Sequence, residues 1–195
     1  MKQRITLMIA ALMLSAVPLG LLTNCKSSKT VTVQDQGERE LIVPCSGPEF
    51  MTDNGHLRAN AIGESMDQMT SKRKALTVAR EIMAAELKVT VKTVTDNYVK
   101  SGEFDNKEQL LERFESLNRE VVKQELTGTK TICEKMTQTK AGNYKTYLAI
   151  ELAGNELLSS LNNRISNDEM LKIDYNYEKF KKTFEEEMNK LDDQK

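Results

Sequence analysis

Apolar side chains recur every three or four positions from Leu76 to Tyr98, a spacing that predicts one long amphipathic helix. Thr70 or Ser71 is the expected cap, and Ser101-Gly102 is the expected end. The second half is rich in β-branched residues and alternates well enough to form a strand, but no turn residue interrupts the helical spacing, so we interpret it as helix. The expected buried face consists of Leu76, Ala79, Met83, Leu87, Val91, Val94 and Tyr98, widened by Ala75, Ile82 and Ala85.

Other segments show the two-residue alternation of β-strands. Residues 129–139 and 144–152 alternate on either side of Lys140-Ala141-Gly142-Asn143, which predicts a hairpin. In residues 57–65 small side chains alternate with polar ones, as in a strand that a helix crosses closely. A shorter apolar strand is predicted over residues 40–44, where it ends at a proline and a turn follows.

Helical spacing returns after each of these segments. A second helix begins near Asn106, and its short connection to the first predicts an antiparallel helical hairpin. A short helix follows from Gly154 to about Arg164, and a last one starts at Asn167-Asp168. These elements predict an α+β fold: a small antiparallel sheet packed against a long helical hairpin, with C-terminal helices. We expect a single domain over residues 40–195, with a C-terminal helical extension from about residue 165.

The N-terminal residues have the pattern of a secretory signal. Lys2 and Arg4 precede an apolar run, and the chain turns polar directly after Cys25. The residues before that cysteine resemble the lipobox of bacterial lipoproteins, although the family prefers Gly, Ala or Ser where this chain has Asn24. We expect residues 1–24 to be a lipoprotein signal peptide, Cys25 to carry the lipid as a diacylglyceryl cysteine, and residues 25–39 to form a flexible tether. A plain signal peptide and a retained anchor helix are the alternatives.

Composition narrows the class of protein further. Removing residues 1–24 from the 195 leaves 171, which suits one domain, with 26 basic and 29 acidic side chains. The chain lacks the excess of basic residues that would favour nucleic acid as a partner. Aromatic residues make up only 5% of the chain and include no tryptophan, which also argues against base stacking on single-stranded nucleic acid. With Cys25 assigned to lipid, Cys45 and Cys133 are the cysteines left, and outside the cytoplasm they are candidates for a disulfide. The alternative is that they are unpaired core residues.

Candidate catalytic groups are few. His56 is the single histidine, beside Gly55 in a predicted turn, and we interpret it as a solvated side chain. The chain contains no zinc-binding spacing of Cys and His, no nucleophile elbow and no phosphate-binding glycine loop. Glu64 and Asp67 follow the first long strand, where a capping or surface role is favoured over acid–base catalysis. We therefore expect no enzyme activity, no metal and no cofactor.

A family resemblance rests on Ala59-x-Ala61-x-Gly63, on Ala75, Ala79-Arg80 and Leu87 in the helix after it, and on the strands within residues 130–136 and 144–152. These features are similar to those of small bacterial outer-membrane lipoproteins of the Lpp-twenty type, whose fold is shared with the N-terminal domain of a T-type flagellar assembly protein. The resemblance covers residues 55–160 and excludes the C-terminal helix. It implies a lipid-anchored α+β domain in assembly or envelope upkeep, with no catalytic residues to carry over.

The resulting expectation is a non-enzymatic envelope lipoprotein, anchored in the outer membrane and facing the periplasm, which binds a protein partner. The alternative is an envelope hydrolase or small-ligand-binding protein. Phe180, Phe184 and Met188 form an apolar stripe on the last helix and are the candidate partner surface. The competing interpretation is that this stripe packs inside the domain itself.

Overall fold

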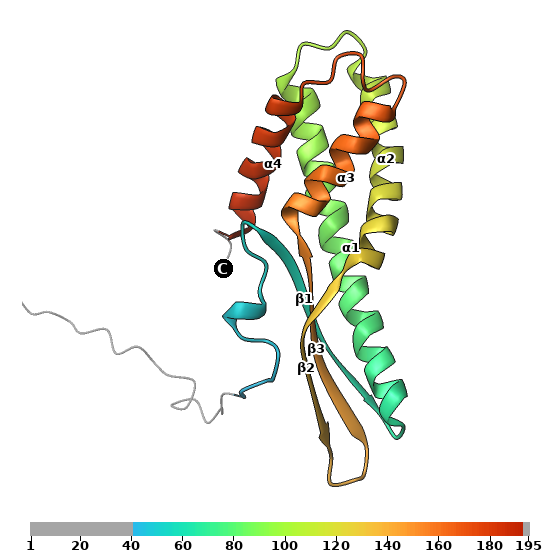
Figure 1. The fold of residues 1–195 in the computed structure, drawn as a ribbon, viewed down its shortest axis with the longest axis vertical. Coiled ribbons are helices and arrows are strands. Elements are labelled where there is room, and N and C mark those ends of the chain that lie inside the picture. The colour runs from blue at the N-terminus through green and yellow to red at the C-terminus, as the bar shows by residue number, and fades with distance from the viewer. Residues whose placement is uncertain (1–40, 193–195) are drawn as a thin grey trace, which may run out of the picture. The chain divides into compact units, whose positions relative to one another are not determined.

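The computed structural model describes residues 41–192, so the predicted signal peptide, Cys25 and the tether lie outside the described residues. A short 3₁₀ helix at Pro48–Phe50 precedes the first strand (Figure 1). The elements that follow are β1 (His56–Ser65), α1 (Gln68–Ser101), α2 (Lys107–Gly128), β2 (Lys130–Gln138), β3 (Tyr144–Ala153), α3 (Gly154–Asn167) and α4 (Tyr177–Asp192). This α+β architecture confirms the predicted fold class.

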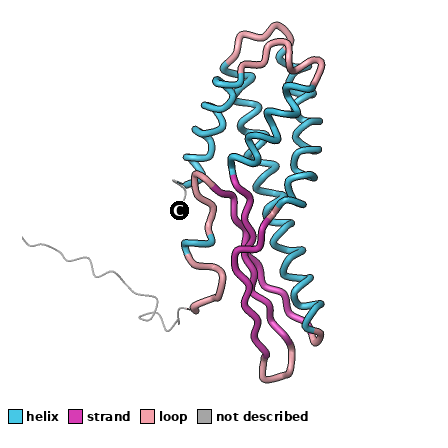
Figure 2. Tube along the Cα trace, in the orientation of Figure 1, coloured by secondary structure: helices cyan, strands magenta, loops and turns pink. Residues whose placement is uncertain are grey.

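The three strands form one antiparallel sheet in the order β1-β3-β2, with α1 packed on one face (Figures 1 and 2). Alternate residues of the strands are apolar and face α1, and the apolar residues of α1 at helical spacing face the sheet. The buried side chains at this interface include Leu57 and Ala59 of β1, Leu148, Ile150 and Leu152 of β3, and Ala75, Ala79, Met83 and Leu87 of α1.

The predicted close crossing of strand and helix occurs at Gly63. A Cβ atom built there would lie 2.2 Å from the Ser71 carbonyl oxygen and 2.5 Å from the Ala75 amide nitrogen. The Ser71 hydroxyl donates to the Gly63 carbonyl oxygen at 2.9 Å, and Thr146 of β3 donates to Ser71 at 2.8 Å. Glycine is required here because α1 passes too near β1 for a side chain to fit.

The C-terminal half of α1 is surrounded by the other helices. It pairs with α2 as the predicted hairpin and also contacts α4. Tyr98 is the centre of an aromatic cluster, with its ring centroid 5.3 Å from that of Phe180 on α4 and 6.3 Å from that of Phe114 on α2. The Tyr98 hydroxyl accepts the Asn176 amide at 2.8 Å, which places the start of α4 against α1. Burial raises the pKa of this phenol above its ordinary value.

Several predicted details of α1 are wrong. The helix begins earlier than Thr70 or Ser71, because Asp67 is its N-cap and accepts the Thr70 amide at 2.7 Å. Ile82 and Ala85 were expected to widen the buried face, but both are exposed, Ile82 by 45%. They lie on the side of α1 that faces away from the sheet, so the buried stripe is narrower than the apolar pattern suggests.

Two other expectations are corrected. Residues 41–44 of the predicted strand 40–44 form no ladder with the sheet, since this segment runs into a turn at Pro44 and Cys45. The last helix starts at Tyr177 instead of Asn167-Asp168, because Asp168 ends α3 and its carboxylate accepts the Met170 and Leu171 amides in a tight turn. Asn176 then caps α4 by accepting the Lys179 amide.

Candidate functional site

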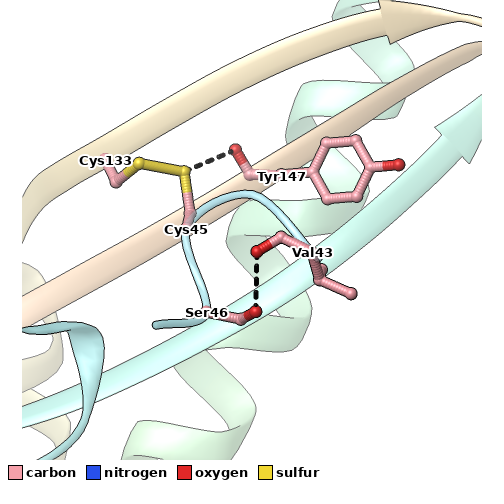
Figure 3. Close-up of a disulfide and its surroundings, with 5 residues drawn as sticks. All are labelled: Val43, Cys45, Ser46, Cys133 and Tyr147. Carbon is pink, nitrogen blue, oxygen red and sulfur yellow. Dashed lines mark hydrogen bonds between the residues drawn. A yellow bond between two sulfur atoms is a disulfide. The ribbon is translucent and has the colours of Figure 1, made fainter. Parts of the chain in front are cut away.

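A disulfide joins Cys45, in the segment before β1, to Cys133 on β2, with a Cα–Cα distance of 5.6 Å (Figure 3). Cys45 is buried, and its sulfur lies 3.7 Å from the carbonyl oxygen of Tyr147 on β3. That approach is a packing contact, since a disulfide sulfur carries no hydrogen to donate. The predicted pairing is therefore present, and it fastens residues 42–55 to the face of the sheet opposite α1.

A β-bulge directs Cys133 toward this face. Thr131 pairs with Ile150 and Cys133 pairs with Ala149, so Ile132 is an extra residue in β2. Without the extra residue, strict alternation would pair Cys133 with Leu148 and direct it toward α1. The bulge thus places the sulfur where Cys45 can reach it.

An ion-pair network holds the rest of the same segment. Arg58 of β1 donates to Asp53 at 2.6 Å and to Glu151 of β3 at 2.7 Å. Burial alone would raise the pKa of Asp53, but hydrogen bonds from the Gly55 amide, Arg58 and His56 lower it to about 2. This segment is therefore fixed by a covalent bond at one end and by paired charges at the other.

The segment also covers the free edge of β1. The Thr52 hydroxyl oxygen accepts the Arg58 amide at 2.9 Å, and this hydroxyl lies 2.7 Å from a carboxylate oxygen of Glu86 on α1. Burial raises the pKa of Glu86, an effect that the contact with Thr52 opposes. An edge strand with open backbone groups is prone to pair with other chains, and this cover blocks part of it.

The candidate acid–base residues lie at both ends of β1, with His56 at its start and Glu64 and Asp67 at or just beyond its end. His56 begins β1 and its ring nitrogen lies 3.2 Å from Asp53. Glu64, at the other end of β1, is exposed and accepts a hydrogen bond from Asn143 at 3.0 Å, which lowers its pKa. Asp67 is the cap of α1, in agreement with the capping role favoured above.

The stripe on α4 does not form a partner surface. Phe180, Phe184 and Met188 are exposed by only 0%, 4% and 1%, because α4 packs this side against α1 and α3. The competing interpretation, in which the stripe belongs to the domain's own core, is the correct one.

A polar groove of about 1230 Å³ lies between α2 and α3. At one end Arg113 of α2 pairs with Asp168 at 2.5 Å. Burial alone would raise the pKa of Asp168, but bonds from Arg113 and from the Leu171 and Met170 amides lower it. Farther along, Arg164 of α3 pairs with Glu120 at 2.8 Å and also donates to Gln124. These contacts connect the two helices across the groove.

Glu125 differs from the other carboxylates of this groove. Its residue surface is only 8% exposed, yet its side chain forms no hydrogen bond or ion pair with any described residue. In the described part of the chain, the fully buried side-chain oxygens without a partner belong to Thr90 and Asn118, so the Glu125 carboxylate still reaches the groove that it lines. A cation from outside the domain can therefore pair with it.

This groove was not predicted from the sequence. A signal for it was present in α3, where Asn155, Ser159, Asn163 and Asn167 recur at every fourth position and form one short polar stripe. That stripe lines the groove. Apolar periodicity locates only what a helix buries, so it gives no sign of a polar groove.

The range 41–192 contains no group of three or more His, Cys, Asp or Glu side chains arranged to hold a metal ion. None of its helices has the length and hydropathy that a membrane span requires. The predicted lipidation site, Cys25, lies outside this range, so its role stays a prediction.

The chain was compared with protein-family models, with curated proteins and with solved structures, and nothing in any of the three matches it.

Proposed function

We propose that the chain is a lipid-anchored lipoprotein of the cell envelope, held in the outer membrane through Cys25 and facing the periplasm. On this proposal the domain is a non-enzymatic assembly or interaction module. The support from sequence is the basic, apolar and polar succession that ends at Cys25, together with the resemblance to Lpp-twenty-type lipoproteins.

The observation that carries the proposal is the disulfide between Cys45 and Cys133. Such bonds persist in oxidising compartments and are rare where thiols are kept reduced, so this bond is consistent with a location outside the cytoplasm. Its position also suits a tethered domain, because it fastens the segment that directly follows the predicted tether.

Acylation tests the anchor. Cells that express the full chain should incorporate radiolabelled palmitate into it, and Cys25→Ser should abolish the label and leave an uncleaved precursor. Two acyl chains hold a protein on a membrane far more firmly than one, since each buried CH₂ contributes ~0.8 kcal/mol. A wild-type protein without label, or one that leaves the membrane fraction under mild washing, would contradict the proposal.

The groove between α2 and α3 favours one alternative, a small-ligand-binding protein, over the other, a hydrolase. Asp168 is paired with Arg113 and its pKa is lowered, so it does not provide the protonated acid that hydrolysis of a glycan needs. A pulldown from crosslinked envelopes separates the two classes. The interaction module predicts a protein partner, whereas the ligand-binding alternative predicts none.

A further inference from the structure

The groove between α2 and α3 is lined by more acidic than basic side chains, and only some of the acidic ones are paired. Five carboxylates and two guanidinium groups line it, a balance of −3. Asp168, Glu120 and Glu156 are each paired with a basic side chain of the domain. Glu125 and the exposed Glu169 are not paired with any described residue. The groove therefore has two carboxylates available to an external cation.

These two carboxylates belong to opposite ends of the groove. Glu169 follows Asp168, which pairs with Arg113 near the start of α2, while Glu125 lies near the end of α2. Arg113 and Glu125 are twelve residues apart, which corresponds to about 18 Å along the helix axis at 1.5 Å per residue. A single metal ion cannot bridge such a distance, and the described residues hold no cluster suited to one.

The polar side chains between the two ends of the groove are suited to binding a peptide. The polar stripe of α3, Asn155, Ser159, Asn163 and Asn167, offers both donors and acceptors. The amide and carbonyl groups of an extended peptide use both kinds of group, whereas an aliphatic polyamine offers only donors. An extended chain advances about 3.3 Å per residue, so about five residues separate two cations that fit the two carboxylates.

We propose that the groove between α2 and α3 binds an extended segment of a partner protein that carries two Lys or Arg residues about five positions apart. The basic group at one end pairs with Glu125, and the one at the other end pairs with Glu169. This proposal rests on the assignment to an envelope interaction module and names the chemistry of its partner.

The probe is the peptide acetyl-Lys-Ser-Gly-Ser-Gly-Lys-amide, titrated into the full chain in detergent by calorimetry at about 50 mM salt, where screening is moderate. Saturable binding is expected. Glu125→Gln should weaken it about tenfold, equivalent to ~1.4 kcal/mol. Glu169→Gln should weaken it about threefold, because exposed pairs contribute less. Glu178→Gln is the matched control on α4, with the same loss of charge outside the groove, and should bind as the wild type does.

Stability measurements separate binding from folding. Without peptide, Glu125→Gln should melt at the same temperature as the wild type or higher, because it removes an unpaired carboxylate from a buried position. A clear fall in Tm would show that Glu125 supports the fold, and it would overturn the proposal.

Other outcomes also overturn it: no saturable binding below about 1 mM peptide, equal binding by the two groove variants and the control, or equal binding of a peptide with Glu in place of both Lys. Binding of spermidine as tight as that of the peptide would show a general polycation site instead of a peptide groove.

The same proteins distinguish this proposal from the anchor. Cys25→Ser should lose palmitate and keep peptide binding, while Glu125→Gln should keep palmitate. Failure of acylation with intact peptide binding would therefore remove only the anchor, and the converse would remove only the groove.

Discussion

Breaking the Cys45–Cys133 disulfide should strongly destabilise the domain. The bond closes a loop with a sequence separation of 88. On the chain-entropy model, a cross-link over that length lowers the entropy of the unfolded chain enough to contribute about 4–5 kcal/mol to the free energy of unfolding. For a domain of this size each kcal/mol corresponds to about 2–4 °C, so Tm should fall by about 8–20 °C.

Thermal and urea unfolding of the full chain, with and without a phosphine reductant, measure this change. Reduction of the wild type is the cleanest perturbation because both sulfurs stay in place. Cys133→Ser adds a second measurement that also removes the thiol of Cys133. The urea m-value should rise on reduction, since a cross-linked unfolded chain exposes less surface.

Two results would contradict this prediction. If the oxidised and reduced proteins melt within about 2 °C of each other, the bond does not constrain the unfolded chain as the entropy model requires. If alkylation after thiol blocking finds two free thiols, in protein taken from the envelope, the disulfide is absent in the cell and the observation carrying the proposed function is lost.

Three further predictions follow from individual contacts. Gly63→Ala should destabilise by about 1–3 kcal/mol in urea unfolding, because its Cβ would overlap the backbone of α1, whereas Gly128→Ala, with open space around it, should not. The pKa of Asp53 is lowered to about 2, so its contribution of about 1–2 kcal/mol is present above pH 4 and is lost as pH falls from about 4 to 2. Acid titrations of stability should show a loss in the wild type that exceeds the loss in Asp53→Asn by that amount, because other carboxylates with lowered pKa values, such as Asp168, remain in the variant. Met83→Ala should cost about 2–5 kcal/mol and Ile82→Ala less than about 1 kcal/mol; equal effects would contradict the burial of one and the exposure of the other.

Local periodicity predicted most of the fold because it records which side chains are buried. The segment from Val89 to Thr95 was ambiguous, since β-branched residues favour strands and their alternation suited one. It is helical because Val91 and Val94 continue the buried stripe of α1 toward Tyr98. Tertiary packing overrides weak intrinsic propensity when the apolar spacing is continuous.

The course of two segments that are held by distant contacts was not predicted. The run at residues 40–44 has the composition of a strand, but residues 41–44 form no ladder with the sheet, and the chain continues into segment 45–55 and its bond to Cys133. The spacing of α4 extends back to Leu171, which is buried although it lies in a loop. Elsewhere, apolar residues at helical spacing are mostly both buried and helical. Residues 168–176 are an exception, because the Asp168 carboxylate holds the backbone in a turn.

The same distinction explains why the candidate stripe on α4 is part of the core and not a partner surface. The apolar stripe of α4 drew attention because apolar groups attract partners, but a regular apolar stripe is what a helix needs to join its own core. The groove on α2 and α3 instead depends on Glu125, whose position resembles that of a core residue in the spacing Phe114, Leu117, Val121, Glu125. A carboxylate at a core position conflicts with the local pattern. Such conflicts tend to occur at functional sites, where stability is given up for binding. In this chain that conflict, more than any apolar stripe, is the basis for the proposal that the groove binds a partner.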